Sequence, residues 1–121
     1  MNLRKKAAGE PCLIRVPDAC RDDPAYTVLA HVRMADISGM GIKAPDVIGA
    51  LGCDRCHDIV DGRDWTGLLF SYTPEQRRLM LLEGFVRTIM RRIEQGYIVV
   101  KGEREPRREK LRKIVPRRLP A

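Results

Sequence analysis

The densest group of chemically active side chains is the run Cys53-Asp54-Arg55-Cys56-His57-Asp58-Ile59-Val60-Asp61. It combines a C-x-x-C thiol pair with a histidine that follows at once and with several carboxylates. Thiolate, imidazole and carboxylate groups are the usual metal ligands of proteins. On a helix that begins near Asp54, His57 and Asp61 stand at i and i+4, so both side chains point the same way. The run therefore predicts a metal-binding site.

Two further cysteines precede this run and extend the predicted metal chemistry. The β-branched segment 13–16 is followed by Pro17-Asp18, which predicts a strand that runs into a turn. Such a turn would bring the cysteines at its two ends together. We expect one tetrahedral zinc site with four thiolate ligands, supplied by Cys12, Cys20, Cys53 and Cys56. Two disulfides are the alternative, which a reducing compartment disfavours.

Length and composition predict one small domain with a modest core. The chain has 121 residues, of which 44% are apolar, and it contains two Phe and one Trp. Cores of this size commonly need a metal or disulfide staple. No apolar stretch follows the basic residues near the amino end, and no run reaches the ~18 apolar residues of a membrane span. We therefore expect an intracellular protein without a membrane partner.

The net charge of +7 is concentrated at the carboxyl end. Residues 1–100 carry 14 Lys or Arg against 13 Asp or Glu, whereas residues 101–121 carry 9 against 3. This distribution divides the chain into a predicted domain over 1–102 and a basic, flexible tail over 103–121. A basic tail is typical of polyanion binding. A purely solubilising tail is the alternative.

Several elements are expected to position these groups. Residues 27–33 are apolar and β-rich, which predicts a strand carrying His31. Thr73-Pro74 begins a helix of about twenty residues, with Gln76 completing a capping box. Residues 97–100 predict a short edge strand. The apolar stripe of the long helix is expected to pack on the core, with a homodimer through helix 75–95 as the alternative; it comprises Leu79, Leu82, Phe85, Val86, Ile89, Met90 and Ile93. Its other face is rich in arginine, and two alternatives are open for it: it faces solvent, or it continues a phosphate-binding surface. The arginines are Arg77, Arg78, Arg87, Arg91 and Arg92.

A histidine on a strand, followed by a thiol pair and a ligand on the next helix, resembles the ββα-metal core of HNH or His-Me finger endonucleases. The resemblance narrows to the YbcO-like nuclease family of phages and prophages. The matching segments run from residue 1 to about residue 63 and include Ile14-Arg15-Val16-Pro17, Thr27-Val28-Leu29-Ala30-His31, Gly41-Ile42-Lys43-Ala44-Pro45-Asp46 and the cysteine run.

This resemblance implies an α+β fold: a small zinc-stabilised ββα-metal core followed by a long amphipathic helix and a short strand. It further implies a metal-dependent DNA endonuclease in the bacterial cytoplasm. His31 would be the general base, and His57 with Asp61 would hold catalytic Mg²⁺ or Mn²⁺. The four cysteines would be structural zinc ligands. Arg15, Arg33, Arg55 and Arg63 are the candidates for phosphate contacts.

The chain departs from the HNH pattern at two positions. Ala30 stands where many HNH enzymes carry a metal-binding Asp or His before the base, and the usual orienting Asn is replaced near Asp46. The alternative function is therefore a non-catalytic, zinc-dependent nucleic-acid-binding or recombination accessory protein. In that interpretation His31 bonds to the backbone, His57 replaces one zinc thiolate, and Asp58 and Asp61 stabilise the first turn of a helix. A thiol-redox role lacks the expected βαβ surroundings.

Overall fold

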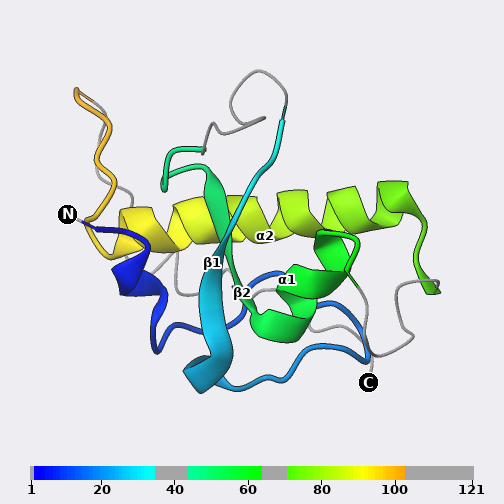
Figure 1. Ribbon diagram of the computed structural model, residues 1–121. Coiled ribbons are helices and arrows are strands. Elements are labelled where there is room, and N and C mark those ends of the chain that lie inside the picture. The colour runs from blue at the N-terminus through cyan, green and yellow to red at the C-terminus, as the bar shows by residue number, and fades with distance from the viewer. Residues whose placement is uncertain (1, 35–43, 64–70, 103–121) are drawn as a thin grey trace.

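The computed structural model describes residues 2–34, 44–63 and 71–102. Two antiparallel strands and two α-helices form a small α+β fold, as predicted, and two 3-10 helices precede the strands (Figure 1). The elements, in chain order, are η1 (Lys5–Ala7), η2 (Pro24–Tyr26), β1 (Thr27–His31), β2 (Gly49–Cys53), α1 (Asp54–Val60) and α2 (Pro74–Glu94). The expected tail over 103–121 lies outside the described residues. No helix in the described ranges is long and apolar enough to cross a bilayer.

Strands β1 and β2 form the centre of the fold. Thr27 pairs with Cys53 and His31 with Gly49, so the hairpin ends directly at the second thiol pair. Every residue of β2 is buried, because α2 packs against this strand and crosses behind the hairpin in Figure 1. Gly52 has no Cβ, and this makes room for Ile14, whose Cδ1 lies 2.4 Å from the position that a Cβ would take.

Helix α2 begins as the sequence predicts. The Thr73 hydroxyl accepts a hydrogen bond from the Gln76 amide, and the Gln76 side chain accepts one from the Thr73 amide. Pro74 occupies the first turn, where its missing N–H costs nothing. The helix continues to Glu94, and Gly96 with φ of +79° follows its end. The capping box and the glycine thus set both boundaries of the element.

The orientation of α2 is the reverse of the predicted one. Its fully buried residues are Gly84, Thr88 and Arg92, which recur every four residues on one face. Gly84 allows close approach to Ile14, and the Thr88 hydroxyl accepts a hydrogen bond of 2.9 Å from the Leu51 amide. Within the predicted stripe, Phe85 packs on the core, whereas the most exposed members face solvent: Leu79, Leu82 and Val86.

A buried arginine explains part of this reversal. Arg92 is only 2% exposed, and its guanidinium donates to the carbonyls of Leu3 and Lys6 and to the side chain of Gln95. These bonds satisfy its polar atoms, so burial of the cation is tolerated. Arg92 therefore fastens the amino-terminal segment to the carboxyl end of α2 instead of facing solvent.

Two predicted strands are absent from the described residues. Residues 13–16 form a bent loop, in which the Leu13 amide bonds to the Leu51 carbonyl and the Val16 amide bonds to the Cys56 sulfur. Arg15, which lies between them, has φ of +58°, a left-handed conformation that interrupts an extended strand. Residues 97–100 are likewise irregular, because the amides of Tyr97 and Ile98 close the end of α2 through the Arg92 carbonyl.

Candidate active site and zinc centre

The four cysteines come together at one place beneath the hairpin. Their Sγ atoms all lie within 4.8 Å of one another, and none of the four forms a disulfide. Cys12 and Cys20 come from the loops before β1, whereas Cys53 ends β2 and Cys56 lies in α1. Within residues 2–34, 44–63 and 71–102, this is the one group of three or more His, Cys, Asp or Glu side chains able to hold a metal ion.

The donor set fits zinc. Four thiolates about 2.3 Å from a tetrahedral Zn²⁺ would be roughly 3.8 Å apart, within the observed spread. Three backbone amides already donate to two of the sulfurs: Val16 to Cys56 at 3.3 Å, and Arg21 and Cys56 to Cys53 at 3.5 and 3.4 Å. Such bonds stabilise thiolates, the form that binds metal. The four close cysteines can therefore hold an ion such as Zn²⁺.

The ionisation of these thiols leads to the same conclusion. Hydrogen bonding with Cys20 lowers the pKa of the Cys12 thiol to about 7, and hydrogen bonds led by the one with Cys12 also lower the pKa of Cys53. The same contacts raise the pKa of Cys20 and of Cys56. Four adjoining thiols thus cannot all ionise by themselves, because their negative charges would repel one another. A bound divalent cation would neutralise that repulsion.

The loop that presents Cys12 and Cys20 has an unusual backbone. Arg15, Asp18 and Asp22 adopt the left-handed region, with φ between +51° and +64°. The Arg15 Nε donates to the Cys12 carbonyl at 3.1 Å, so this side chain helps to close the turn. The loop takes this shape because the cysteines and their amide donors must converge. Arg15, predicted to contact phosphate, thereby gains a structural partner.

An ion pair that the sequence did not indicate fastens this loop to α1. Arg21 binds both carboxylate oxygens of Asp54, at 2.6 and 3.1 Å, and its guanidinium lies 4.1 Å from the centre of the Tyr26 ring. Bidentate pairs of this kind fix the relative position of two segments. No pattern in the sequence indicated that residues so far apart would pair.

His57 and Asp61 meet at the end of α1, as the i, i+4 spacing predicts. The His57 Nε2 lies 3.0 Å from the Asp61 Oδ2. The same oxygen is 3.0 Å from the Arg63 guanidinium and 3.7 Å from that of Arg33. Asp61 caps the carboxyl end of α1 and does not stabilise a first turn, so the predicted alternative role for this residue is wrong.

The basic groups around Asp61 together lower its pKa by more than burial raises it. Burial favours the neutral acid and raises the pKa, whereas the hydrogen bond from His57, the charge of His57 and the charges of Arg33 and Arg63 lower it. The net effect holds the pKa of the Asp61 carboxyl below its ordinary value. Asp61 is therefore a carboxylate at neutral pH, the form that accepts hydrogen bonds and binds cations.

His31 pairs with a residue from the connection between the strands. Its Nε2 lies 2.8 Å from the Asp46 Oδ1, and the imidazole is mostly buried. In the described residues, no hydrogen bond or ion pair joins His31 to His57 or Asp61.

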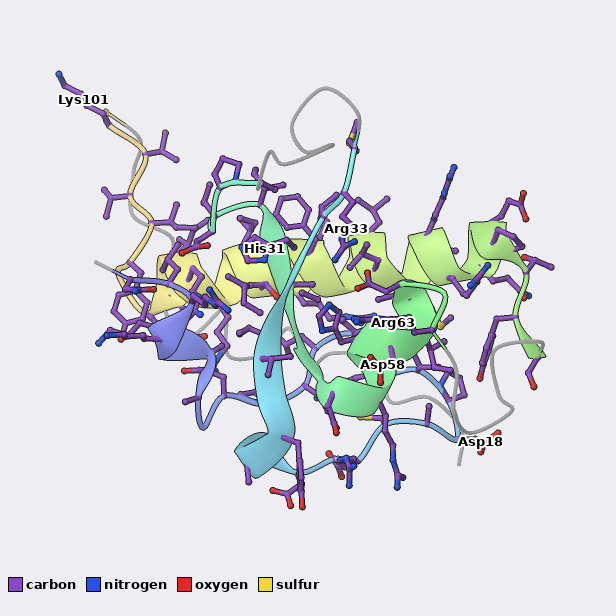
Figure 2. All side chains as sticks on the ribbon, viewed as in Figure 1. Asp18, His31, Arg33, Asp58, Arg63 and Lys101 are labelled. Carbon is purple, nitrogen blue, oxygen red and sulfur yellow. The ribbon has the colours of Figure 1, made fainter. Side chains whose placement is uncertain are left out.

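Arg33 connects the His31–Asp46 pair with the His57–Asp61 pair. It follows His31 by two residues, and its guanidinium lies 3.7 Å from the Asp61 carboxylate, which connects the chain around the end of β1 to the chain around the end of α1. Figure 2 labels His31 and Arg33 on the first of these segments and Asp58 and Arg63 on the second. Ala30 precedes the histidine but is 1% exposed and belongs to the core around Ala50 and Cys56. Its methyl group cannot bind a metal.

The predicted phosphate contacts differ in their surroundings. Arg33 and Arg63 have side chains that are 75% and 60% exposed. Arg55 is partly buried, and its Nε is fully buried without a hydrogen bond. The structure therefore keeps Arg33 and Arg63 accessible beside Asp61, whereas Arg15 and Arg55 are held within the fold.

Comparison with known proteins gives a consistent set of relatives. The sequence model of the family described as "Putative nuclease YbcO" matches residues 1–97. Proteins of that name from Escherichia coli (strain K12) and Enterobacteria phage 82 are each 37% identical over 97 residues, covering 80% of this chain and 96% of the relative. A solved structure, described as that of a putative bacteriophage protein from Escherichia coli str. K-12 substr. MG1655, aligns with a TM-score of 0.63. Its sequence identity is 33%, and the alignment covers 78% of this chain and all of the other.

Proposed function

Because the chain belongs to the YbcO family, whose model matches residues 1–97, we propose that it is a metal-dependent endonuclease that hydrolyses phosphodiester bonds of DNA in the bacterial cytoplasm. The family name supplies the reaction class, and the geometry of the described residues supports a mechanism. The order β1, β2, α1 supports an HNH-type ββα core. A structural Zn²⁺ on the four cysteines would fasten this core to the loops before β1.

The convergence of cationic groups on Asp61 carries this proposal. A single carboxylate oxygen faces His57, Arg63 and Arg33, which come from a helix, a turn and the end of a strand. A stability role would be satisfied by one partner. Asp58 also pairs with Arg63, at 3.5 Å. Two carboxylates among three basic groups, two of which are exposed, suit a site that binds a cation and a phosphate together.

His31 is the proposed general base. Asp46 accepts a hydrogen bond from the Nε2–H, which leaves Nδ1 as the nitrogen that takes a proton from the attacking water. Asp46 also fixes the orientation of the ring, in place of the usual Asn. Histidine is the residue whose ordinary proton affinity suits this task near neutral pH.

His57 and Asp61 are the proposed ligands of Mg²⁺ or Mn²⁺. Magnesium is commonly held by one or two protein ligands, with water and substrate phosphate filling the remaining positions, so a pair of ligands is adequate. When bound, the cation would stabilise negative charge that develops on the phosphate. Arg33 and Arg63 would bind the flanking phosphates and hold the DNA strand across the ends of β1 and α1.

Cleavage of supercoiled plasmid by zinc-loaded protein tests this proposal. Wild-type protein with Mg²⁺ or Mn²⁺ should nick the plasmid, and His31→Ala should lose at least ~100-fold in rate, since general-base catalysis typically contributes this much. Val28→Ala, an exposed position on the same strand, is the matched control and should cut normally. Equal zinc content and equal DNA affinity would show that each variant is folded.

A non-catalytic DNA-binding protein is the second candidate, and the buried methyl group of Ala30 favours it. In that case the wild-type protein would bind DNA yet leave it intact with every divalent cation tried. Binding without cleavage would thus replace the nuclease proposal with the binding one. Cleavage abolished by His31→Ala would exclude the second candidate.

The outward stripe of α2 supports a further proposal, that two copies pair through this helix. Leu82 and Met90 stand four residues to either side of Val86, while Leu79 and Ile93 stand seven residues away. The spacing is thus symmetric, and an antiparallel pair with Val86 on the two-fold axis would bring Leu79 opposite the second copy's Ile93. Such self-complementarity is what an isologous interface requires.

Residues 1–102 form the proposed nuclease domain, and 103–121 form a proposed basic arm for DNA. Deletion of 103–121 should weaken duplex binding and reduce the slope of log affinity against log salt by about 0.9 for each lost phosphate contact. An unchanged slope would show that residues 103–121 do not contact DNA phosphates.

A further inference from the structure

One arginine at the junction of the two helices, Arg77, belongs to the helix face for which the sequence left solvent or a phosphate-binding surface open. Arg77 lies in the first turns of α2, and its Nη1 is 3.2 Å from the place that a Cβ on Gly62 would occupy. Gly62 has φ of +79° and immediately follows Asp61. The guanidinium of Arg77 therefore rests against the turn that ends α1, where the absence of a Cβ leaves it room.

Arg77 is incompletely satisfied in this position. Its Nε is fully buried and has no hydrogen-bond partner. Across the described parts of the chain, its guanidinium forms neither a hydrogen bond nor an ion pair, although the residue is partly buried. Leaving a buried donor unpaired is costly, so such a group in a native fold calls for a partner from outside the chain, which is a water, an ion or a ligand.

The surroundings identify the charge of the missing partner. Arg33, Arg63 and Arg77 approach the turn at Asp61 and Gly62 from the end of β1, the end of α1 and the start of α2. Asp61 already engages Arg33 and Arg63 as well as His57. Arg63 also pairs with Asp58, at 3.5 Å. Among the described residues, three guanidinium groups thus lie near two carboxylates, and Arg77, which pairs with neither, is left to bind an external anion.

We propose that Arg77 binds a phosphate of the nucleic-acid substrate beside the Asp61 turn. This inference deepens the proposed function, since it rests on DNA being the ligand of that site. A guanidinium is suited to this role because its fixed, planar donors match two phosphate oxygens. The burial of Nε would hold the group in one orientation before the substrate arrives.

A structural role is the competing explanation. The carboxyl end of α1 carries partial negative charge, and a guanidinium close to it can stabilise the helix without a direct hydrogen bond. The two roles predict opposite effects on stability. A structural Arg77 should be needed for folding, whereas a phosphate-binding Arg77 should be replaceable by Met, which keeps the aliphatic stem and removes the unpaired donor.

The test compares Arg77→Met with Arg78→Met in zinc-loaded, full-length protein. Arg78 is the adjacent arginine on the same helix, but it is exposed and points about 100° away around the helix axis. Each protein would be titrated with a fluorescent duplex oligonucleotide over a range of KCl concentrations, without divalent cation. Thermal unfolding of the free proteins would be recorded in parallel.

For Arg77→Met we expect duplex affinity about tenfold lower and a salt slope smaller by about 0.9, with an unfolding midpoint that is unchanged or higher. Arg78→Met should change affinity by less than about twofold. Equal effects of the two substitutions would overturn the proposal. So would an Arg77→Met protein that unfolds ~4 °C or more below wild type, or fails to fold, because that outcome assigns Arg77 to the structure.

These outcomes are separable from the fate of the nuclease proposal. Because the titration contains no divalent cation, a protein that never cuts DNA would still reveal the Arg77 contact. If the wild type cleaves plasmid and Arg77→Met behaves as Arg78→Met, the nuclease stands and the Arg77 contact falls. A wild type that binds no DNA would overturn both.

Discussion

At the scale of single residues, Asp61 is the carboxylate that brings basic groups together at the end of α1. A carboxylate with one partner would be an ordinary helix-terminal contact, but Asp61 Oδ2 is shared by His57, Arg63 and Arg33. Because all three contacts favour the ionised form, they overcome the burial that would neutralise it. Arg63 has Asp58 as a second partner, whereas Arg33 reaches Asp61 only at 3.7 Å and is mostly exposed, which keeps Arg33 available to an anion.

Removal of the His57 imidazole should therefore change the pKa of the Asp61 carboxyl. In His57→Ala the hydrogen bond disappears while much of the burial remains, so the pKa of the Asp61 carboxyl should rise. Arg33→Ala is the control and should raise this pKa less, since Arg33 is mostly exposed and 3.7 Å away. Carbon-13 NMR titration of the aspartate side chains, without magnesium, would measure both. An unchanged pKa in His57→Ala would contradict the described pairing.

The same contact has a pH signature in stability. The folded pKa of Asp61 is below its unfolded value, so the stabilisation is complete above the unfolded pKa of ~3.9. It is lost as the pH falls through the folded value. The difference in unfolding free energy between wild type and Asp61→Asn should thus be constant near neutral pH and shrink at acidic pH. A difference that persists unchanged into acid would assign the effect to something other than this carboxylate.

At the scale of elements, α2 combines a strongly defined start with an unexpected orientation. Its capping box follows from local sequence, because the partners are three residues apart and need only each other. Its rotation about its own axis depends on contacts with Ile14 and Leu51, which are more than thirty residues away in the chain. The position of Arg77 beside α1 depends on both the start of α2 and its rotation.

Loss of the cap should destabilise α2 by a predictable amount. Thr73→Ala removes the hydroxyl that accepts from the Gln76 amide, and such changes cost about 1 kcal/mol. Ser71→Ala, exposed and two residues earlier, should be nearly neutral. Denaturant unfolding of the zinc-loaded proteins would give both values. If the two substitutions were equal, the capping box would contribute nothing to the folded protein.

At the scale of the whole molecule, the four-cysteine centre joins the loops before β1 to β2 and α1. Its members contribute to the core together with Ile14, Val16 and Ile59. A core this small has few large side chains, so a bound ion would supply much of the cohesion. The active-site candidates lie on the same hairpin and helix, which makes their geometry dependent on this centre.

Chelation of zinc should consequently unfold the domain. Purified protein should contain about one zinc per chain, and a strong chelator in reducing buffer should abolish most helical circular dichroism and the cooperative thermal transition. Added Zn²⁺ should restore both. A chelated protein that keeps its unfolding midpoint would show that the four thiols are not the staple.

Pairing through α2 is a separate property of the whole molecule. Sedimentation equilibrium at up to ~100 μM should show a dimer that Val86→Lys disrupts, because a charge on the two-fold axis would face its copy. Val99→Lys is the control; Val99 is exposed but lies beyond α2, and its substitution should leave association unchanged. A wild type that remains monomeric at this concentration would contradict the proposed dimer.

Local sequence determined the grouping of candidate metal ligands and several elements of this protein. The C-x-x-C-H-D run, the i, i+4 spacing of His57 and Asp61 and the start of α2 are set by residues close together in the chain, so pattern and spacing were sufficient. The strand predicted over 27–33 was found over 27–31, two residues shorter. The convergence of all four cysteines was also predicted, because metal-binding thiols have few other uses in a reducing compartment.

Tertiary structure alone decided how these pieces face one another. Whether the apolar or the arginine face of α2 turns inward depended on the missing Cβ of Gly84 and on carbonyls that Arg92 reaches near the amino end. Hydrophobic periodicity cannot anticipate this, because it records where apolar residues lie but not where buried polar groups will find partners. For the same reason, the pairs Arg21 with Asp54 and His31 with Asp46, and the place of Arg77 against Gly62, required the folded chain.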